Sequence, residues 1–137
     1  MTPTELLEIE YPASDGKPMA ESTQQYWTIV NITSALNSYY ANDPNVFVAS
    51  DNLIYPVQFH PEICYAPDVY IAFGRPKGDR SSYRVWLEGN IFPQIIFEIL
   101  SPSNSTEEMA AKLDFYRRYG AEEYYVYDPE THDLEIY

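Results

Sequence analysis

The chain has 137 residues, of which 45% are hydrophobic, and 21 acidic against 8 basic residues give it a formal net charge of −13. This length favours a single domain over residues 1–137, and the hydrophobic share excludes a disordered chain. No apolar stretch approaches the roughly 20 residues that span a bilayer, and the single cysteine, Cys64, excludes an internal disulfide and a cysteine-rich zinc site. The first residues lack the basic start and apolar core of a signal peptide, so a cytoplasmic location is expected.

Hydrophobic periodicity and turn residues predict alternating helices and strands. In chain order, the pattern predicts a short helix over residues 4–10, a helix over 19–40, and two strands over 46–49 and 53–57 that pair as a hairpin. It then predicts a strand over 69–73, a short strand or an irregular segment over 83–87, a strand over 95–100, a helix over 106–119, and strands over 123–127 and 134–137. This order predicts an α/β fold in which helices flank a mixed β-sheet. Because the last strand pattern stops at the final residue, we expect that some C-terminal structure of the domain is missing.

The two long helices carry recognisable end signals. Ser105 begins a capping-box pattern, and Gly120 fits the C-terminal end of the second long helix. The start of the first long helix is open, because Pro18 could occupy the first turn or Ser22 could cap it. Either choice places Glu21 close to the first turn.

Two acidic residues lie in apolar strand patterns. Glu98 interrupts the most apolar run of the chain, residues 93–100, and Asp68 opens the run of residues 67–73. A buried carboxylate needs a partner or a metal ion, so two strands that each carry one acid suggest that Asp68 and Glu98 meet around a divalent cation. The alternative is a strand end at which Glu98 reaches solvent or pairs with an arginine.

Two further charged side chains fall on helix faces that are predicted to turn inward. Lys112 lies within the apolar arc of the helix over 106–119, where it either reaches the pocket of Glu98 or extends its charged end to solvent. Glu21 lies on the core-facing side at the start of its helix, where it either joins the other acids or complements the helix dipole. The residues alone leave both alternatives open.

Half of the eight basic residues fall in one short stretch, as Arg75, Lys77, Arg80 and Arg84. The functional interpretation is a basic loop that grips the phosphates of a nucleic acid, and the alternative is a mobile, solvated hairpin. The net charge of −13 argues against strong nonspecific attraction to nucleic acid, because phosphate binding depends on lysine and arginine.

Several short segments together resemble the PD-(D/E)XK nuclease superfamily and, within it, the Uma-two family of restriction endonucleases. The matching segments are residues 15–22, 66–69, 97–101 and 112–127, in that order and spacing. The resemblance implies a restriction-endonuclease-like core in which Asp68, Glu98 and the Ile99 carbonyl bind Mg²⁺ or Mn²⁺. It also implies that Glu21 is a helix-borne catalytic acid and that Gln25, one turn later, is an auxiliary residue.

The chain departs from the superfamily pattern at one position. Where the pattern has a lysine two residues after the second acid, this chain has Leu100. The resemblance implies that the lysine of this branch lies on the following helix, as Lys112. Catalysis therefore depends on whether Lys112 reaches the acids.

These residues support the hypothesis of an endonuclease that hydrolyses DNA phosphodiester bonds with Mg²⁺ or Mn²⁺. A homodimer is expected, because cutting both strands requires two sites and twofold pairing is the commonest assembly. The rival hypothesis is a catalytically inactive domain of the same fold that acts in protein interaction or regulation, and the charge of −13 and the absent strand lysine favour it. A hydrolase of another phosphoester would keep the metal site but not the DNA.

Overall fold

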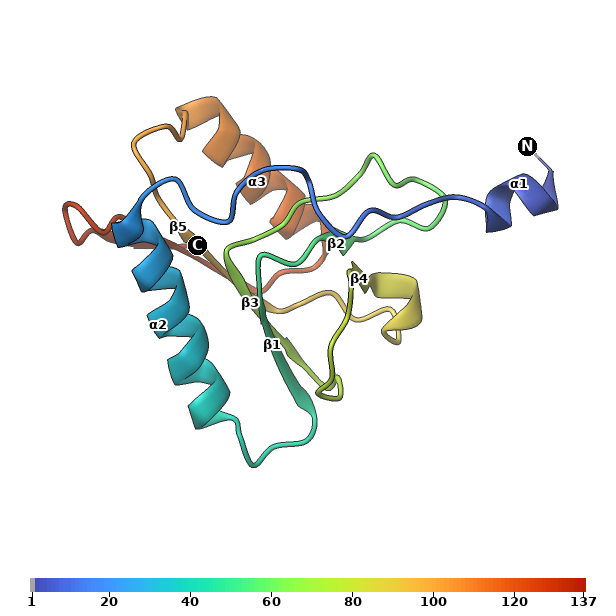
Figure 1. The fold of residues 1–137 in the computed structure, drawn as a ribbon, viewed down its shortest axis with the longest axis horizontal. Coiled ribbons are helices and arrows are strands. Elements are labelled where there is room, and N and C mark those ends of the chain that lie inside the picture. The colour runs from blue at the N-terminus through green and yellow to red at the C-terminus, as the bar shows by residue number, and fades with distance from the viewer. Residues whose placement is uncertain (1) are drawn as a thin grey trace.

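A five-stranded sheet with helices on both faces forms the centre of the structure, a computed structural model that describes residues 2–137 (Figure 1). The helices are α1 (Pro3–Leu7), α2 (Thr23–Tyr39) and α3 (Thr106–Tyr119), with a 3-10 helix, η1 (Val85–Leu87). The strands are β1 (Val46–Ser50), β2 (Ile54–Tyr55), β3 (Val69–Phe73), β4 (Tyr83–Arg84), β5 (Ile95–Ile99), β6 (Glu123–Tyr127) and β7 (Leu134–Ile136). The predicted α/β fold is therefore confirmed.

The sheet is mixed, with the strand order β1-β3-β5-β6-β7. Strands β5 and β6 are parallel, whereas the other neighbouring strands of this sheet are antiparallel. A parallel pair needs a long crossover, and α3 supplies it between β5 and β6. Because a crossover helix covers the sheet, β5 is buried in the centre and its apolar composition follows from its position.

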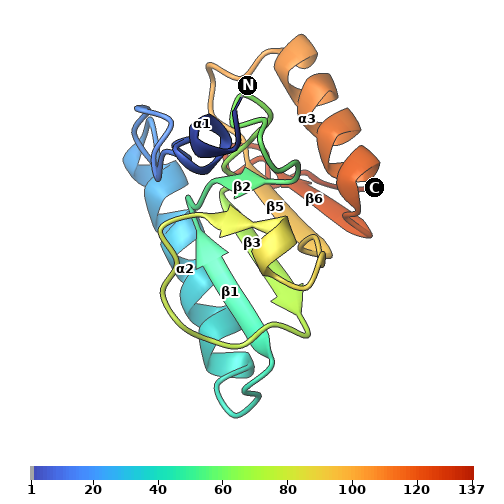
Figure 2. The ribbon, with the colours of Figure 1, turned by 90° about the vertical axis from the view of Figure 1, so that its right-hand side faces the viewer.

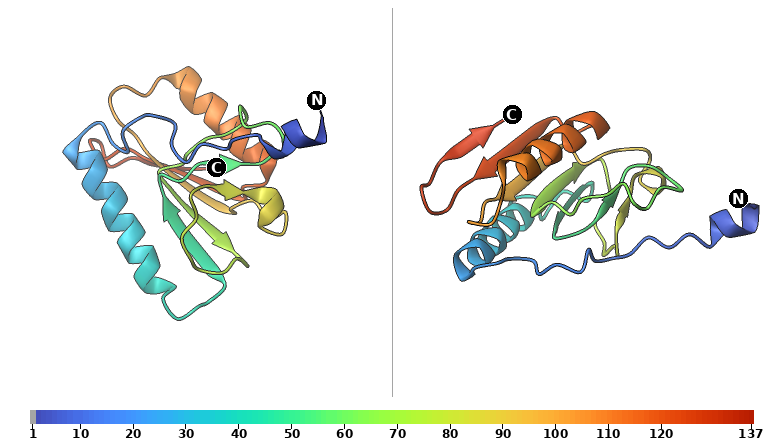
Figure 3. Two further views of the ribbon diagram at one scale, coloured as in Figure 1. Left: turned by 45° about the vertical axis from the view of Figure 1, so that its right-hand side comes forward. Right: turned by 90° about the horizontal axis from the view of Figure 1, so that it is seen from above.

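Each face of the sheet has its own apolar cluster. On one face, Ile29 of α2 packs against Val69 of β3 and Ile99 of β5. On the other face, α3 and the segments that carry β2, β4 and η1 cover the sheet (Figure 2), and Tyr116 and Ile96 lie at the centre of that cluster. The sheet therefore lies between α2 and α3 (Figure 3).

The predicted hairpin over residues 46–57 is wrong. Strand β1 pairs with β3, with Ser50 opposite Val69, and β2 pairs in parallel with β4 in a separate two-stranded sheet. The chain leaves the sheet at Asp51, which has a φ of 48° and donates its N–H to the Asp68 carbonyl at 3.2 Å. The segment 83–87, expected to be a short strand or irregular, is a two-residue strand that passes directly into η1.

Helix α2 begins at Thr23 and is shorter at its start than the predicted 19–40 helix. Ser22 is the cap, because its Oγ accepts a hydrogen bond from the N–H of Gln25 at 3.1 Å. Helix α3 has the predicted ends, with Ser105 as the N-terminal cap and Gly120 at a φ of 126° after the last turn.

Residues 2–12 form an arm that projects from the body of the molecule (Figure 3, right). Helix α1 has no buried residue and is held at its start by a capping box between Thr2 and Glu5. The arm meets the body at Tyr11 and Pro12, where the hydroxyl of Tyr55 donates to the Pro12 carbonyl at 2.5 Å. Among residues 2–137, no helix combines the length and apolar character that crossing a membrane requires.

The packing of α2 on the sheet gives a first prediction. Ile29 has 0% exposure, so Ile29→Ala should lower the free energy of unfolding by about 2–5 kcal/mol through lost burial and an unfilled cavity. Ser34→Ala changes an exposed position of the same helix and should shift it by less than about 0.5 kcal/mol. Urea denaturation of both variants makes the comparison, and equal effects would contradict the described packing.

Candidate active site

Asp68, the residue just before β3, and Glu98 of β5 lie opposite each other. Strands β3 and β5 pair Val69 with Phe97 and Tyr70 with Ile96, so the same register places Asp68 opposite Glu98. Oδ2 of Asp68 accepts the backbone N–H of Ile99 at 2.7 Å, and the two carboxyl groups lie within hydrogen-bonding reach of one another. The structure thus brings together the two acids that the strand patterns singled out.

Helix α3 supplies two side chains to this carboxylate pair. Nζ of Lys112 lies 3.4 Å from Oε2 of Glu98, and the hydroxyl of Tyr116 donates to Oε1 of Glu98 at 2.8 Å. Lys112 and Tyr116 are four residues apart, so they share one helix face. Lys112 also lies 3.7 Å from Glu108, one turn earlier. The alternative of a lysine that extends to solvent is therefore wrong.

Tyr116 is a site residue that the sequence analysis missed. It belongs to the same apolar arc of α3 as Lys112, and its side chain is fully buried. The available signal was the spacing of four residues from Lys112, but an aromatic residue on an apolar helix face is ordinarily a core residue. Only the structure shows that its hydroxyl is directed at Glu98.

The electrostatics of the pair follow from burial. Burial raises the pKa of Asp68, and the Glu98 carboxylate raises it further against the opposing effects of the Ile99 N–H and Lys112. Burial also raises the pKa of Glu98, although Lys112 and Tyr116 act in the opposite direction. For Lys112, burial lowers the pKa but the carboxylates outweigh this effect and raise it, so the ammonium group stays charged.

Gln25 joins α2 to the end of β5. Its Nε2 donates to the Ile99 carbonyl at 2.8 Å, and its Oε1 accepts the N–H of Glu21 at 2.9 Å. Hydrogen bonds therefore hold both backbone groups of Ile99: Gln25 binds its carbonyl, and Asp68 binds its N–H. The Ile99 carbonyl, which the resemblance implies as a metal ligand, already accepts this hydrogen bond and keeps a second lone pair.

Glu21 lies outside the carboxylate pair. It precedes the cap of α2, so the prediction of a helix-borne, inward-pointing acid is wrong. Its exposed carboxylate accepts hydrogen bonds from Ser101, at 3.0 Å, and Ser103, and these bonds lower its pKa. Within residues 2–137, no group of three or more acidic, histidine or cysteine side chains is placed to hold a metal ion.

The basic stretch is fastened to the body of the protein. Nε of Arg80 lies 2.7 Å from Oε2 of Glu88, and Arg75 lies 3.6 Å from the same carboxylate. Lys77 donates to the carbonyl of Val46 at 2.8 Å. Arg75 and Arg80 are therefore paired with a buried carboxylate and not free in solvent, and a role of the stretch in phosphate binding stays a prediction.

Comparisons with known proteins agree with this architecture. A mixed sheet with flanking helices is the fold of a solved structure described as a putative nuclease from Anabaena variabilis, with a TM-score of 0.62 and 17% sequence identity over 100% of this chain and 84% of that chain. The chain belongs to the Uma2 (Uma-two) family, which is described as "Putative restriction endonuclease" and matches residues 4–137. The family resemblance of the sequence motifs is thus confirmed. No curated protein matches the chain.

The raised pKa values of the pair predict how stability depends on pH. Each carboxyl group binds its proton more tightly in the folded chain than in the unfolded chain. Its contribution to stability is therefore complete below about pH 4, the unfolded pKa, and is lost as pH rises through the raised folded pKa. Asp68→Asn keeps an acceptor for the Ile99 N–H and gains a donor toward Glu98, so it should stabilise the metal-free protein by about 1 kcal/mol near pH 8.

Thermal denaturation of metal-free protein near pH 5 and near pH 8 measures this effect, with the gain expected to shrink at the lower pH. Asp114→Asn is the matched control, because Asp114 is exposed on α3. A destabilised Asp68→Asn protein at both pH values would contradict the described carboxylate pair.

Proposed function

We propose that this chain is a divalent-metal-dependent endonuclease that hydrolyses phosphodiester bonds of DNA. The observation that carries the proposal is the convergence of Asp68, Glu98 and Lys112 on one face of the sheet. Two carboxylates beside an ammonium group are suited to hold a cation and to stabilise a transition state that gains negative charge. The chain's membership of the Uma2 family, which is described as "Putative restriction endonuclease", supports the same chemistry.

The donor set fits Mg²⁺ or Mn²⁺. Both ions prefer oxygen ligands, and Mg²⁺ keeps several waters when few carboxylates bind it. The carboxyl groups of Asp68 and Glu98 lie within hydrogen-bonding reach of one another, and the contact of Glu98 Oε2 with Lys112 is long at 3.4 Å, so both carboxylates could turn oxygens toward one shared ion. A bound divalent ion would activate a water and neutralise charge on the scissile phosphate.

The protein side chains have separable tasks in this proposal. Tyr116 fixes the orientation of Glu98, and the N–H of Ile99 fixes that of Asp68. Lys112 would stabilise the extra negative charge of the transition state, because its ammonium group is charged and largely withdrawn from water. Gln25 would hold the end of β5 in place through the Ile99 carbonyl. Glu21 would act beside the loop of residues 101–103, where Ser101 donates a hydrogen bond to its carboxylate.

A second candidate function is a catalytically inactive domain of this fold that binds a protein or regulates one. The net charge of −13 and the leucine at position 100 favour it. The two candidates differ in whether the carboxylate pair binds metal. A third, a hydrolase of another phosphoester, differs from the first in the substrate alone. If the protein cuts both strands of DNA, we expect it to act as a twofold dimer.

Metal binding should be visible as thermal stabilisation. A ligand that binds only the folded state at about 100 times its dissociation constant adds about 2.7 kcal/mol, which is a shift of several degrees in Tm. Mn²⁺ should therefore raise the Tm of the wild type but leave that of Asp68→Asn unchanged, with Asp114→Asn responding like the wild type. No shift in the wild type would favour the inactive domain.

Nicking of supercoiled plasmid with Mg²⁺ or Mn²⁺ tests the nuclease itself. Glu98→Gln keeps the shape of the side chain but removes the charge, and its nicking rate should fall to background. Lys112→Met should lose about 100-fold or more, the cost of removing one stabilising donor from a transition state. Lys17→Met is the control, because Lys17 is exposed in the loop before α2. Equal nicking by wild type and Glu98→Gln would overturn the assignment.

A further inference from the structure

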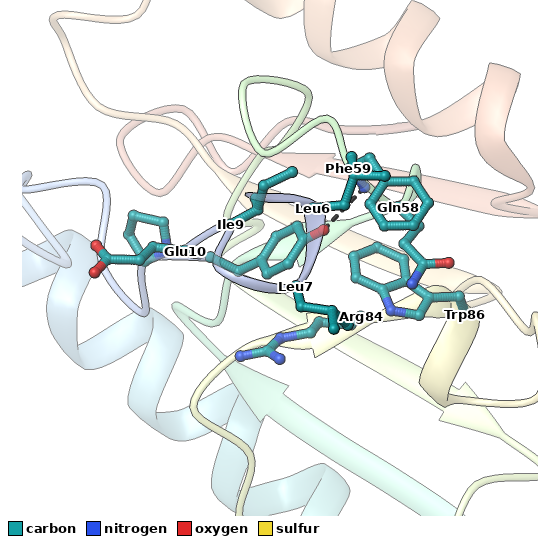
Figure 4. Close-up of a pocket in the computed structure, with 10 residues that line it drawn as sticks. Leu6, Leu7, Ile9, Glu10, Gln58, Phe59, Arg84 and Trp86 are labelled. Atoms are coloured by element: carbon teal, nitrogen blue, oxygen red, sulfur yellow. Dashed lines mark hydrogen bonds between the residues drawn. The ribbon is translucent and has the colours of Figure 1, made fainter. Parts of the chain in front are cut away.

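A hollow of about 510 Å³ lies between the N-terminal arm and the surface formed by β4 and η1 (Figure 4). The arm contributes residues 6, 7 and 9–12, and the body contributes Gln58, Phe59, Arg84 and Trp86. None of the residues proposed for catalysis lines this hollow. It is therefore a second concave surface whose chemistry can be considered separately.

Three aromatic residues line the hollow, Tyr11, Phe59 and Trp86. The ring of Tyr11 lies 5.1 Å from that of Trp86 and 5.3 Å from that of Tyr55, and the Tyr11 hydroxyl accepts the N–H of Phe59 at 2.9 Å. Phe59 is 41% exposed and has a φ of 70°, a backbone conformation that is unfavourable for a bulky residue. The hydrogen bond to Tyr11 thus holds an exposed ring in a strained position, as is typical of functional surfaces.

Arg84 differs from the other three basic residues of its stretch. Its guanidinium group lies over the ring of Tyr11 at 5.1 Å, and its Nε donates to the Ser82 hydroxyl at 3.3 Å. Among residues 2–137, its two terminal nitrogens have no acceptor and it forms no ion pair. These donors are free for an anion, and the planar fork of arginine matches a phosphate.

We infer that this hollow binds an unpaired nucleotide of a DNA strand, with the base against Phe59 and Trp86 and a phosphate at Arg84. The inference rests on the proposed nuclease function and names where the strand is held. Because its net charge is −13, the chain as a whole attracts DNA phosphates only weakly. Stacking of bases on aromatic side chains does not depend on net charge. The one acidic residue of the lining, Glu10, lies at the end of the hollow away from Phe59 and Trp86 (Figure 4), so its charge is not beside the proposed position of the base.

The two tryptophans of the chain, Trp27 and Trp86, provide a site-specific test. Trp27 is 58% exposed on α2 and does not line the hollow, so it is a matched reference. Trp27→Phe leaves Trp86 as the only reporter, and Trp86→Phe leaves Trp27. Both are made in the Glu98→Gln background without metal and titrated with a single-stranded oligodeoxynucleotide of about 12 nucleotides. We expect quenching of Trp86 fluorescence and little change at Trp27.

Arg84→Gln tests the phosphate contact in the Trp27→Phe protein. Its affinity for the oligonucleotide should fall about tenfold, the effect of one charge-assisted hydrogen bond, and the slope of log K against log salt should decrease by about 0.7. Arg117→Gln, an exposed change on α3, is the control. Quenching confined to Trp27, no quenching at either reporter, or unchanged affinity and salt slope in Arg84→Gln would overturn the inference.

Neither measurement requires cleavage, so a failure of the proposed nucleotide subsite can be distinguished from a failure of the proposed nuclease function. Quenching of Trp86 together with an inactive plasmid assay would support the nucleotide subsite and overturn the nuclease. Plasmid nicking without quenching of Trp86 would support the nuclease and overturn the subsite.

Discussion

The juxtaposition of Asp68, which immediately precedes β3, with Glu98 of β5 is the constraint on which the site depends. Two carboxyl groups held together in a largely buried setting repel one another, and burial makes the charged forms costlier. The surrounding structure offsets this cost with the Lys112 ammonium, the Tyr116 hydroxyl and the Ile99 N–H. Such an arrangement weakens the fold and is typical of sites where a cation completes the charge balance.

The rest of the fold positions these few groups. The parallel pairing of β5 with β6 requires a crossover, and the crossover helix α3 carries Lys112 and Tyr116 over the carboxylates. On the opposite face, α2 is capped at Ser22, so that Gln25 reaches the Ile99 carbonyl. Both helices therefore meet the end of β5, one through side chains directed at Glu98 and the other through a backbone carbonyl.

Local patterns predicted the parts of the site that strand alternation and helix periodicity determine. Alternation set Glu98 on one face of β5, and the helical period set Lys112 in the buried arc of α3. Pairings between distant segments were not predictable in this way, because they depend on where the chain leaves the sheet. The chain turns at Asp51, and β1 pairs with β3 in place of the expected hairpin. Glu21 lies outside α2, because Ser22, the residue after it, is the N-terminal cap.

The basic stretch shows the same limit, because its charge pattern says nothing about a buried partner. Glu88 pairs with Arg75 and Arg80, which leaves Arg84 as the arginine of that stretch without an ion pair among residues 2–137. The central claim remains that Asp68 and Glu98 share one divalent ion. Anomalous diffraction from crystals grown with Mn²⁺ tests it most directly. The account predicts a strong peak between the two carboxylates beside Lys112, and a peak absent there but present at Glu21 would contradict it.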